Sequence, residues 1–259
     1  MAQILPHERI TAAIRNAARA NGVALVPYVT AGYPEMAKFI PTLRSIAEVG
    51  DVIEIGVPFS DPMADGVTIQ RASHAAIASG VSLRWILAEL KKAGELPAPV
   101  VLMSYLNPLL AFGVNELADS AARAGVAGFI VPDLPLDEAS ELQTALASRG
   151  IALVQMVTPV TEPQRLAALC AGSRGFVYAV TMTGTTGRNV AVPDEVIAYL
   201  ERVRASAKLP VCAGFGIRTR AQVERLRGHV DGVVVGSALV EVLERGEDPG
   251  QWLRQLRAR

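Results

Sequence analysis

The sequence has few of the residues that identify several common classes of protein. It contains two cysteines and three histidines in 259 residues. Cys170 and Cys212 lie far apart without metal-ligand spacing, so we expect two buried thiols in a reducing compartment. The histidines fall on predicted helices or helix ends, so neither a metal site nor a Ser-His-Asp triad is expected.

An excess of charge of either sign is also missing. Lys plus Arg and Asp plus Glu number 25 each, with no run of like charge, which argues against binding to nucleic acid or to an anionic membrane. No stretch approaches the ~18 consecutive apolar residues of a membrane span, and the N-terminal segment is polar. These features predict a cytoplasmic protein that acts on a small molecule.

The length and the 51% hydrophobic content suit one complete (β/α)8 barrel, which typically has about 250 residues. Short apolar runs alternate with helical patterns along the whole chain, as in a parallel sheet covered by helices. We therefore predict an α/β fold, a single (β/α)8 TIM-barrel domain over residues 1–259. The eight predicted strands are Ala24–Thr30, Val52–Gly56, Pro99–Ser104, Ala127–Val131, Ile151–Val157, Gly175–Ala179, Pro210–Ala213 and Gly232–Val235.

Each predicted strand is followed by a segment with apolar residues at helical spacing or with a helix-start signal. These segments are Glu35–Val49, Ser82–Lys92, Glu116–Ala124, Asp137–Ser148, Pro163–Leu169, Asp194–Ser206, Thr219–Leu226 and Ala238–Glu244. Extra helices are expected at the N-terminus, near the second strand and after the eighth, over His7–Ala20, Val67–Ser79 and Pro249–Arg257. The first of these is expected to close the floor of the barrel.

The second predicted strand carries a carboxylate inside an apolar run. Strand alternation turns Glu54 into the barrel while Ile53 and Ile55 point outward. A structural glutamate there would need a cation or backbone donors, but no Lys or Arg lies near the ends of the neighbouring strands. Since burial raises a carboxyl pKa toward neutrality, we expect Glu54 to transfer protons, with a buried structural role as the alternative.

Two more carboxylates follow in the Pro- and Gly-containing loop 58–66. Asp61 precedes Pro62, and we expect it to be a turn or cap residue that takes no direct part in the chemistry. Asp65 is either a fixed charge beside the substrate or the N-cap of the helix that begins near Val67.

Glycine-containing turns follow the last three predicted strands. Many barrels bind a phosphate at these places through backbone N–H groups and the N-terminus of a short helix. Any one of these glycines could belong to an ordinary turn, but three such turns must converge at one mouth, which favours a phosphate site. The candidate ligands are Gly187, Gly216, Gly236 and Ser237.

Apolar and aromatic residues lie at or beside the ends of the predicted strands. Core packing explains most such residues, although a flat aromatic substrate would need this lining. The residues are Tyr28, Met103, Tyr105, Phe129, Tyr178 and Phe215. We expect Tyr105, Tyr178 and Phe215 to contact the substrate, together with Thr186 in the loop after the sixth predicted strand.

The stretch from Glu54 to Gln70, EIGVPFSDPMADGVTIQ, is similar over its whole length to the active-site motif of the tryptophan synthase α subunit family. Further stretches resemble the same family in the same order along nearly the full chain. They are Val26–Pro34, Met103–Pro108, Val131–Pro135, Gly184–Gly187, Gly214–Ile217 and Val235–Ala238. The loop after the sixth strand departs from the family at Thr181–Thr183. This departure concerns how strongly the loop closes and not the reaction.

The resemblance implies cleavage of indole-3-glycerol phosphate to indole and glyceraldehyde 3-phosphate. It implies that Glu54 is the acid–base group and that Asp65 stabilises the indole nitrogen. It also matches Tyr178 to an active-site tyrosine and the four phosphate-site residues to phosphate ligands. No cofactor or metal is implied for this chain, whereas pyridoxal phosphate is expected in a β subunit that joins it in an α2β2 heterotetramer.

Regulation by that partner is expected to act through two loops. A partner that contacts Asp61 would also fix Asp65, because both lie in one tight loop. The loop 182–192 carries glycines and hydroxyls with little apolar anchorage, so we expect a lid, with Thr186 coupling it to the Asp65 loop.

Three other functions stay open at this point. A standalone indole-3-glycerol-phosphate lyase would share every catalytic residue and differ only at the partner surface. A non-catalytic barrel that binds a phosphorylated ligand and activates a partner is disfavoured by the presence of both Glu54 and Asp65. A generic phosphate-binding barrel isomerase is the remaining alternative.

Overall fold

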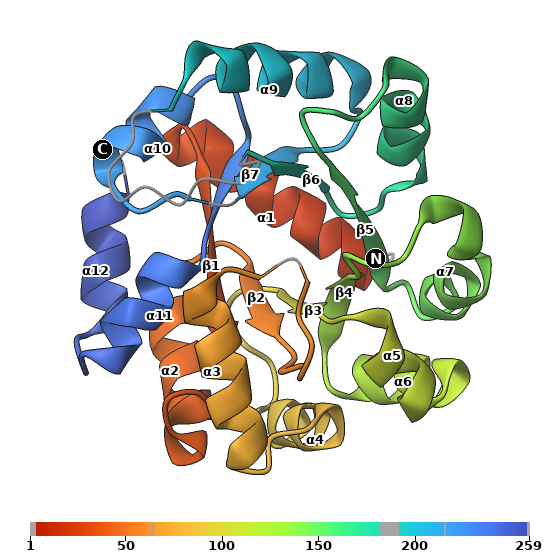
Figure 1. Cartoon of the computed structure of the whole chain (residues 1–259), viewed down its shortest axis with the longest axis vertical. Coiled ribbons are helices and arrows are strands. Elements are labelled where there is room, and N and C mark those ends of the chain that lie inside the picture. Colours follow the sequence, from red (N-terminus) through yellow and green to blue (C-terminus); the bar gives the residue numbers. More distant parts are fainter. Residues whose placement is uncertain (1–3, 64, 182–191, 215, 258–259) are drawn as a thin grey trace.

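The strands of the computed structural model form one closed parallel barrel, in sequence order from β1 to β8 (Figure 1). The structure describes residues 4–63, 65–181, 192–214 and 216–257. The strands are β1 (Ala24–Thr30), β2 (Ile53–Gly56), β3 (Val100–Met103), β4 (Val126–Ile130), β5 (Ala152–Val157), β6 (Val177–Val180), β7 (Val211–Gly214) and β8 (Gly232–Val235). The predicted TIM barrel is confirmed, with strand ends shifted by one or two residues in six of the eight cases.

Alternation along each strand separates an inner from an outer set of apolar side chains. On β2, Ile53 and Ile55 pack in the outer cluster between the sheet and the helices. Glu54 is paired in register with Tyr28 on β1 and with Val101 on β3, which both belong to the inner cluster. Glu54 therefore points into the barrel, as its place in the strand predicts.

The helices surround the barrel (Figure 1). They are α1 (Pro6–Asn21), α2 (Phe39–Ala47), α3 (Val67–Ala78), α4 (Leu83–Ala93), α5 (Leu106–Phe112), α6 (Val114–Arg123), α7 (Ser140–Ala147), α8 (Pro163–Gly172), α9 (Asp194–Ser206), α10 (Arg220–Leu226), α11 (Ser237–Glu244) and α12 (Pro249–Leu256). The three extra helices expected from the sequence correspond to α1, α3 and α12. No helix in the described part of the chain is long and apolar enough to cross a membrane.

Three helical predictions differ in organisation from the structure. The segment predicted as one helix over Glu35–Val49 begins with a short 3-10 turn at Met36–Lys38, and α2 starts only at Phe39. The segment predicted as one helix over Asp137–Ser148 opens in a 3-10 turn, Leu136–Glu138, and α7 starts only at Ser140. The helix α5 was not predicted, because Pro108 resembles a loop signal. In α5 this proline occupies the first turn, where a missing N–H costs no internal hydrogen bond.

The helix α1 lies across the floor of the barrel (Figure 1). Ile10 and Ile14 are fully buried and belong to the same cluster as the inward side chains of the strands. Thr11 Oγ1 donates to the carbonyl of Gly175 at 2.7 Å, and His7 Nδ1 lies 2.9 Å from the carbonyl of Gly150. Apolar packing and these polar contacts fix α1 against the N-terminal ends of the strands, which leaves the opposite end as the mouth.

Candidate active site

Glu54 is the most deeply buried carboxylate in the described part of the chain, with 1% of its surface exposed. Its Oε2 atom has no hydrogen-bond partner among the described residues. Burial and the nearby charge of Asp65 raise the pKa of Glu54 from 4.5 to about 8. A buried carboxyl with an unsatisfied oxygen and a pKa near neutrality is suited to exchanging a proton with a bound molecule.

Asp65 lies half-buried in the loop between β2 and α3. The hydroxyl of Tyr105 donates to Asp65 Oδ2 at 3.4 Å, and Gln70 Nε2 donates to the Asp65 carbonyl at 2.9 Å. The N-cap of α3 is Gly66, so the alternative of Asp65 as the cap is wrong. Phe59 supports this arrangement, because its ring stacks on that of Tyr105 with 4.9 Å between centroids.

The two carboxyls differ in charge at neutral pH. Burial raises the pKa of Asp65 from 3.8 to about 6, and the hydrogen bond from Tyr105 opposes that rise. At pH 7 Glu54 is therefore mainly protonated and Asp65 mainly ionised. The site offers one acid and one fixed anion, and the difference between their environments divides the two roles.

Two buried tyrosines belong to the inner cluster, Tyr28 on β1, which is paired in register with Glu54, and Tyr178 on β6. Burial raises the pKa of both Tyr28 and Tyr178, so both hydroxyls keep their protons at neutral pH. Glycines provide their space, because a Cβ at Gly56 would lie 2.0 Å from the Tyr28 hydroxyl and one at Gly214 would lie 2.2 Å from the Tyr178 hydroxyl. These glycines were not identified from the sequence, since only the fold places them beside the rings.

A candidate phosphate rim is formed by the ends of β7 and β8. Gly216 has φ 81°, a left-handed conformation that favours glycine, in the loop between β7 and α10. Gly236 precedes α11, and its carbonyl accepts from the N–H groups of Leu239 and Val240 at 2.8 and 3.1 Å. The first N–H groups of α11, at Ser237 and the next residue, are thus directed ahead of the helix, where an anion can bind.

The rim adjoins the carboxylates through Tyr28, since a Cβ built on Gly236 would lie 3.6 Å from the Tyr28 ring. The structure thus brings Glu54, Asp65, Tyr105 and Tyr178 to the interior and mouth, next to Gly236. The candidates Thr186, Gly187 and Phe215, together with residues 182–191 of the expected lid, lie outside the described residues. No group of three or more His, Cys, Asp or Glu residues that could hold a metal ion occurs among the described residues.

The exposed part of the Asp65 loop contains Asp61. Its Oδ2 accepts a hydrogen bond from Ser60 Oγ, and the Ser60 carbonyl lies 3.0 Å from His74 Nε2 on α3. Asp61 is exposed, and His74 contacts the loop from outside the barrel. The geometry therefore gives His74 a supporting role in the loop.

Two carboxyls with raised pKa values in the interior and at the mouth of a parallel eight-stranded barrel, beside a glycine rim suited to phosphate, are typical of a barrel enzyme that acts on a phosphorylated small molecule by proton transfer. The tryptophan synthase alpha chain family model matches residues 14–259. The chain belongs to this family.

Relatives of known sequence and structure cover almost the whole chain. The tryptophan synthase alpha chain of Desulfovibrio desulfuricans is 46% identical over 244 residues, which is 93% of this chain and 96% of the relative. A chain in the crystal structure of tryptophan synthase from M. tuberculosis has 37% identity and a TM-score of 0.84, covering 96% of this chain and 97% of that one. Tryptophan synthase subunit alpha from Legionella pneumophila has 31% identity and a TM-score of 0.85, with coverages of 96% and 95%.

Family membership identifies the reaction. The protein is a lyase of tryptophan biosynthesis that cleaves indole-3-glycerol phosphate. The pyridoxal phosphate of tryptophan synthase resides in the β subunit.

Proposed function

We propose that Glu54 and Asp65 divide the chemistry of this cleavage between them. Breaking the bond between C3 of the indole ring and the glycerol chain requires a proton on C3, which makes the ring an electron sink. The protonated Glu54 carboxyl can supply that proton. The same group, then ionised, can accept the proton of the adjacent side-chain hydroxyl as the carbon–carbon bond breaks. The products are indole and the aldehyde of glyceraldehyde 3-phosphate.

Asp65 is the fixed anion in this proposal. Protonation of C3 gathers positive charge at the ring nitrogen, and an ionised carboxylate nearby stabilises it. The observation that carries the assignment is the difference in surroundings: Glu54 is buried with Oε2 unpaired among the described residues, whereas Asp65 is half-buried and accepts from Tyr105, and these surroundings raise the pKa of Glu54 further than that of Asp65. Tyr105, Tyr178 and Phe215 are proposed to contact the indole ring, and Gly187, Gly216, Gly236 and Ser237 the phosphate.

The test is indole release by Glu54→Gln and Asp65→Asn. We expect Glu54→Gln to lose cleavage by about a thousandfold or more, because the only proton-transfer group is gone. Asp65→Asn should also lose most of the activity while binding glyceraldehyde 3-phosphate normally. Glu141→Gln, on the exposed start of α7, is the control and should match wild type. More than a tenth of the wild-type rate in Glu54→Gln would remove Glu54 from its role.

We further propose that the chain joins the β subunit in an α2β2 heterotetramer, with Asp61 at the contact. Exposed apolar side chains in segments that follow β2, β3 and β5 support a partner at the mouth. They are Met63, Val67, Leu110 and Val160, which are 85%, 77%, 52% and 78% exposed. Light scattering of the mixed subunits tests the stoichiometry. The cytoplasmic location stays a prediction from the sequence.

A further inference from the structure

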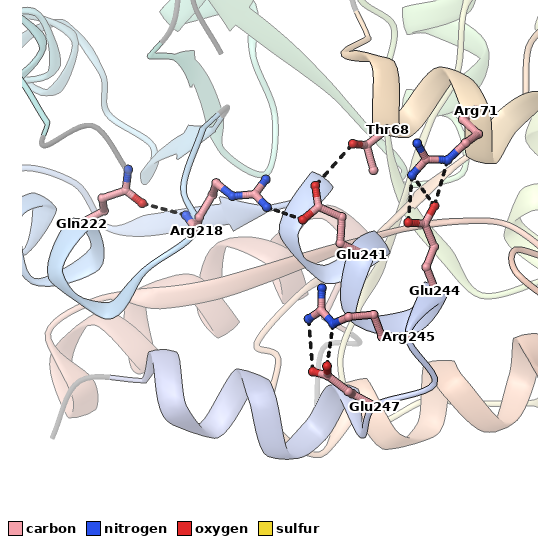
Figure 2. Close-up of polar contacts among 8 residues, drawn as sticks. All are labelled: Thr68, Arg71, Arg218, Gln222, Glu241, Glu244, Arg245 and Glu247. Carbon is pink, nitrogen blue, oxygen red and sulfur yellow. Dashed lines mark hydrogen bonds and ion pairs between the residues drawn. The ribbon is translucent and has the colours of Figure 1, made fainter. Parts of the chain in front are cut away.

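The helix α11, whose first turn forms half of the proposed phosphate rim, is tied to the β7–α10 loop by an ion pair (Figure 2). Glu241 on α11 accepts a hydrogen bond from the guanidinium of Arg218. The same carboxylate accepts from Thr68 Oγ1 on α3 at 3.4 Å. One side chain thus contacts two segments that are distant in sequence.

A second glutamate of α11 strengthens the connection to α3. Glu244 accepts from Arg71 Nη2 at 2.7 and 2.8 Å with its two oxygens (Figure 2). It also accepts from the hydroxyl of Tyr33, which follows β1, at 2.7 Å. Since α3 begins two residues after Asp65, the carboxylate loop and the phosphate helix share these anchors.

The Arg218 end of the network leads directly to Gly216. The backbone N–H of Arg218 donates to Gln222 Oε1 at 2.8 Å, and Gln222 Nε2 donates to the carbonyl of Gly216 at 3.3 Å. Glu241, Arg218 and Gln222 thus form a chain of contacts from α11 to the left-handed turn at Gly216.

The Arg218–Glu241 pair is more protected than a typical surface ion pair. The two side chains are 24% and 22% exposed, whereas Arg245 and Glu247, further along the chain from the rim, are 52% and 49% exposed (Figure 2). A half-buried pair is screened less by water and salt than an exposed one. By charge alone, however, a carboxylate near the phosphate rim would repel a phosphate dianion, so its benefit to binding must come from geometry.

We propose that Glu241 is a positioning residue for the phosphate. Its carboxylate holds Arg218, in the β7–α10 loop, and Thr68, on α3, against α11. It thereby sets the spacing between the Gly216 turn and the Gly236–Ser237 turn, so that the N–H groups of both turns reach one phosphate. The inference rests on the proposed phosphate site at these turns. Preorganised donors bind more tightly than donors that must be ordered when the ligand arrives.

The test measures binding of glycerol 3-phosphate by calorimetry, together with KM and kcat for cleavage in the complex with the β subunit. Glu241→Gln keeps the size of the side chain and removes its charge. We expect affinity to fall and KM to rise by about three- to tenfold, as for coupled, partly buried pairs, with kcat changed less than twofold. Arg218→Gln should have the same effect, and the double variant should be no weaker than either single variant.

Other outcomes would overturn the inference. Tighter binding by Glu241→Gln would mean that charge repulsion dominates, and unchanged binding would mean that the pair contributes only to stability. Multiplying effects in the double variant would mean that Arg218 contacts the phosphate itself. Thermal unfolding confirms that each variant is folded, and Glu247→Gln is the matched control, expected to bind like wild type.

Gly236→Val separates this inference from the site on which it rests. If Gly236→Val loses binding while Glu241→Gln does not, the phosphate site stands and the positioning role fails. If Gly236→Val binds glycerol 3-phosphate as wild type does, the proposed phosphate site itself is wrong, and the positioning role falls with it.

Discussion

Replacing Glu54 by glutamine should stabilise the protein relative to wild type, and this difference should grow as the pH rises, even though the substitution abolishes catalysis. The fold raises the pKa of Glu54 from 4.5 to about 8, first through burial and second through the charge of Asp65. One pKa unit corresponds to about 1.4 kcal/mol, so ionising this side chain in the folded state costs roughly 4 to 5 kcal/mol relative to ionising it in the unfolded chain. Glutamine has no charge and avoids this cost.

The sign and the pH range follow from the direction of the shift. Because the folded pKa is the higher one, folded protein holds a proton on Glu54 that unfolded protein releases between pH 4.5 and about 8. The contribution of Glu54 to stability is thus complete below pH 4.5 and is lost as the pH rises through 8. The free energy of unfolding of Glu54→Gln minus that of wild type should increase by about 3 kcal/mol or more between pH 5 and pH 9.

Urea unfolding of both proteins at pH 5, 7 and 9 provides the measurement. Comparing the difference between the two proteins at each pH cancels the titration of groups that they share. Glu141→Gln, which changes an exposed glutamate, should give a difference that does not vary with pH. A flat difference for Glu54→Gln over the same range would refute the raised pKa, and with it the claim that Glu54 carries a proton at neutral pH.

Three further predictions concern the rim, the tyrosines and the partner. Gly236→Val, with its folding checked by thermal unfolding, should bind substrate and glyceraldehyde 3-phosphate more weakly in calorimetry, because a branched side chain covers the N–H groups that the phosphate approaches; unchanged affinity contradicts a phosphate at Gly236. Gly214→Ala should lower the free energy of unfolding by about 1–3 kcal/mol and slow indole release, since its Cβ would lie 2.2 Å from the Tyr178 hydroxyl; wild-type values for both would contradict that close approach. Asp61→Ala, at an exposed position, should keep wild-type stability and reduce the acceleration of cleavage by the β subunit; full acceleration would remove Asp61 from the contact.

Local sequence patterns predicted the barrel and the orientation of Glu54. Period-two alternation in β2 depends only on the strand itself, so the inward carboxylate could be identified before its neighbours were known. The choice between the two roles of Asp65 could not be made in that way. It depended on the start of α3, whose N-cap is Gly66, and on Tyr105, a residue 40 positions away whose hydroxyl donates to the Asp65 carboxylate.

The features that the sequence could not provide are contacts between distant elements. Thr68 and Glu241 are separated by 173 residues, and no local pattern links a threonine at a helix start to that glutamate. The space that Gly56 leaves for Tyr28 likewise depends on the register of β1 against β2. The helix α5 was missed for a different reason, since a proline in a first turn and a proline in a loop look alike in one sequence.

The helix across the floor gives the barrel a single opening. Ile10 and Ile14 fill the axial space from below with no exposed surface, so a molecule at Glu54 has no exit through the base. The substrate must therefore enter, and both products must leave, through the same opening. The phosphorylated fragment and the ring cannot leave by opposite ends of the barrel. If a partner covers that rim, as proposed, it controls every molecule that enters or leaves, and it also determines the route of the freed ring.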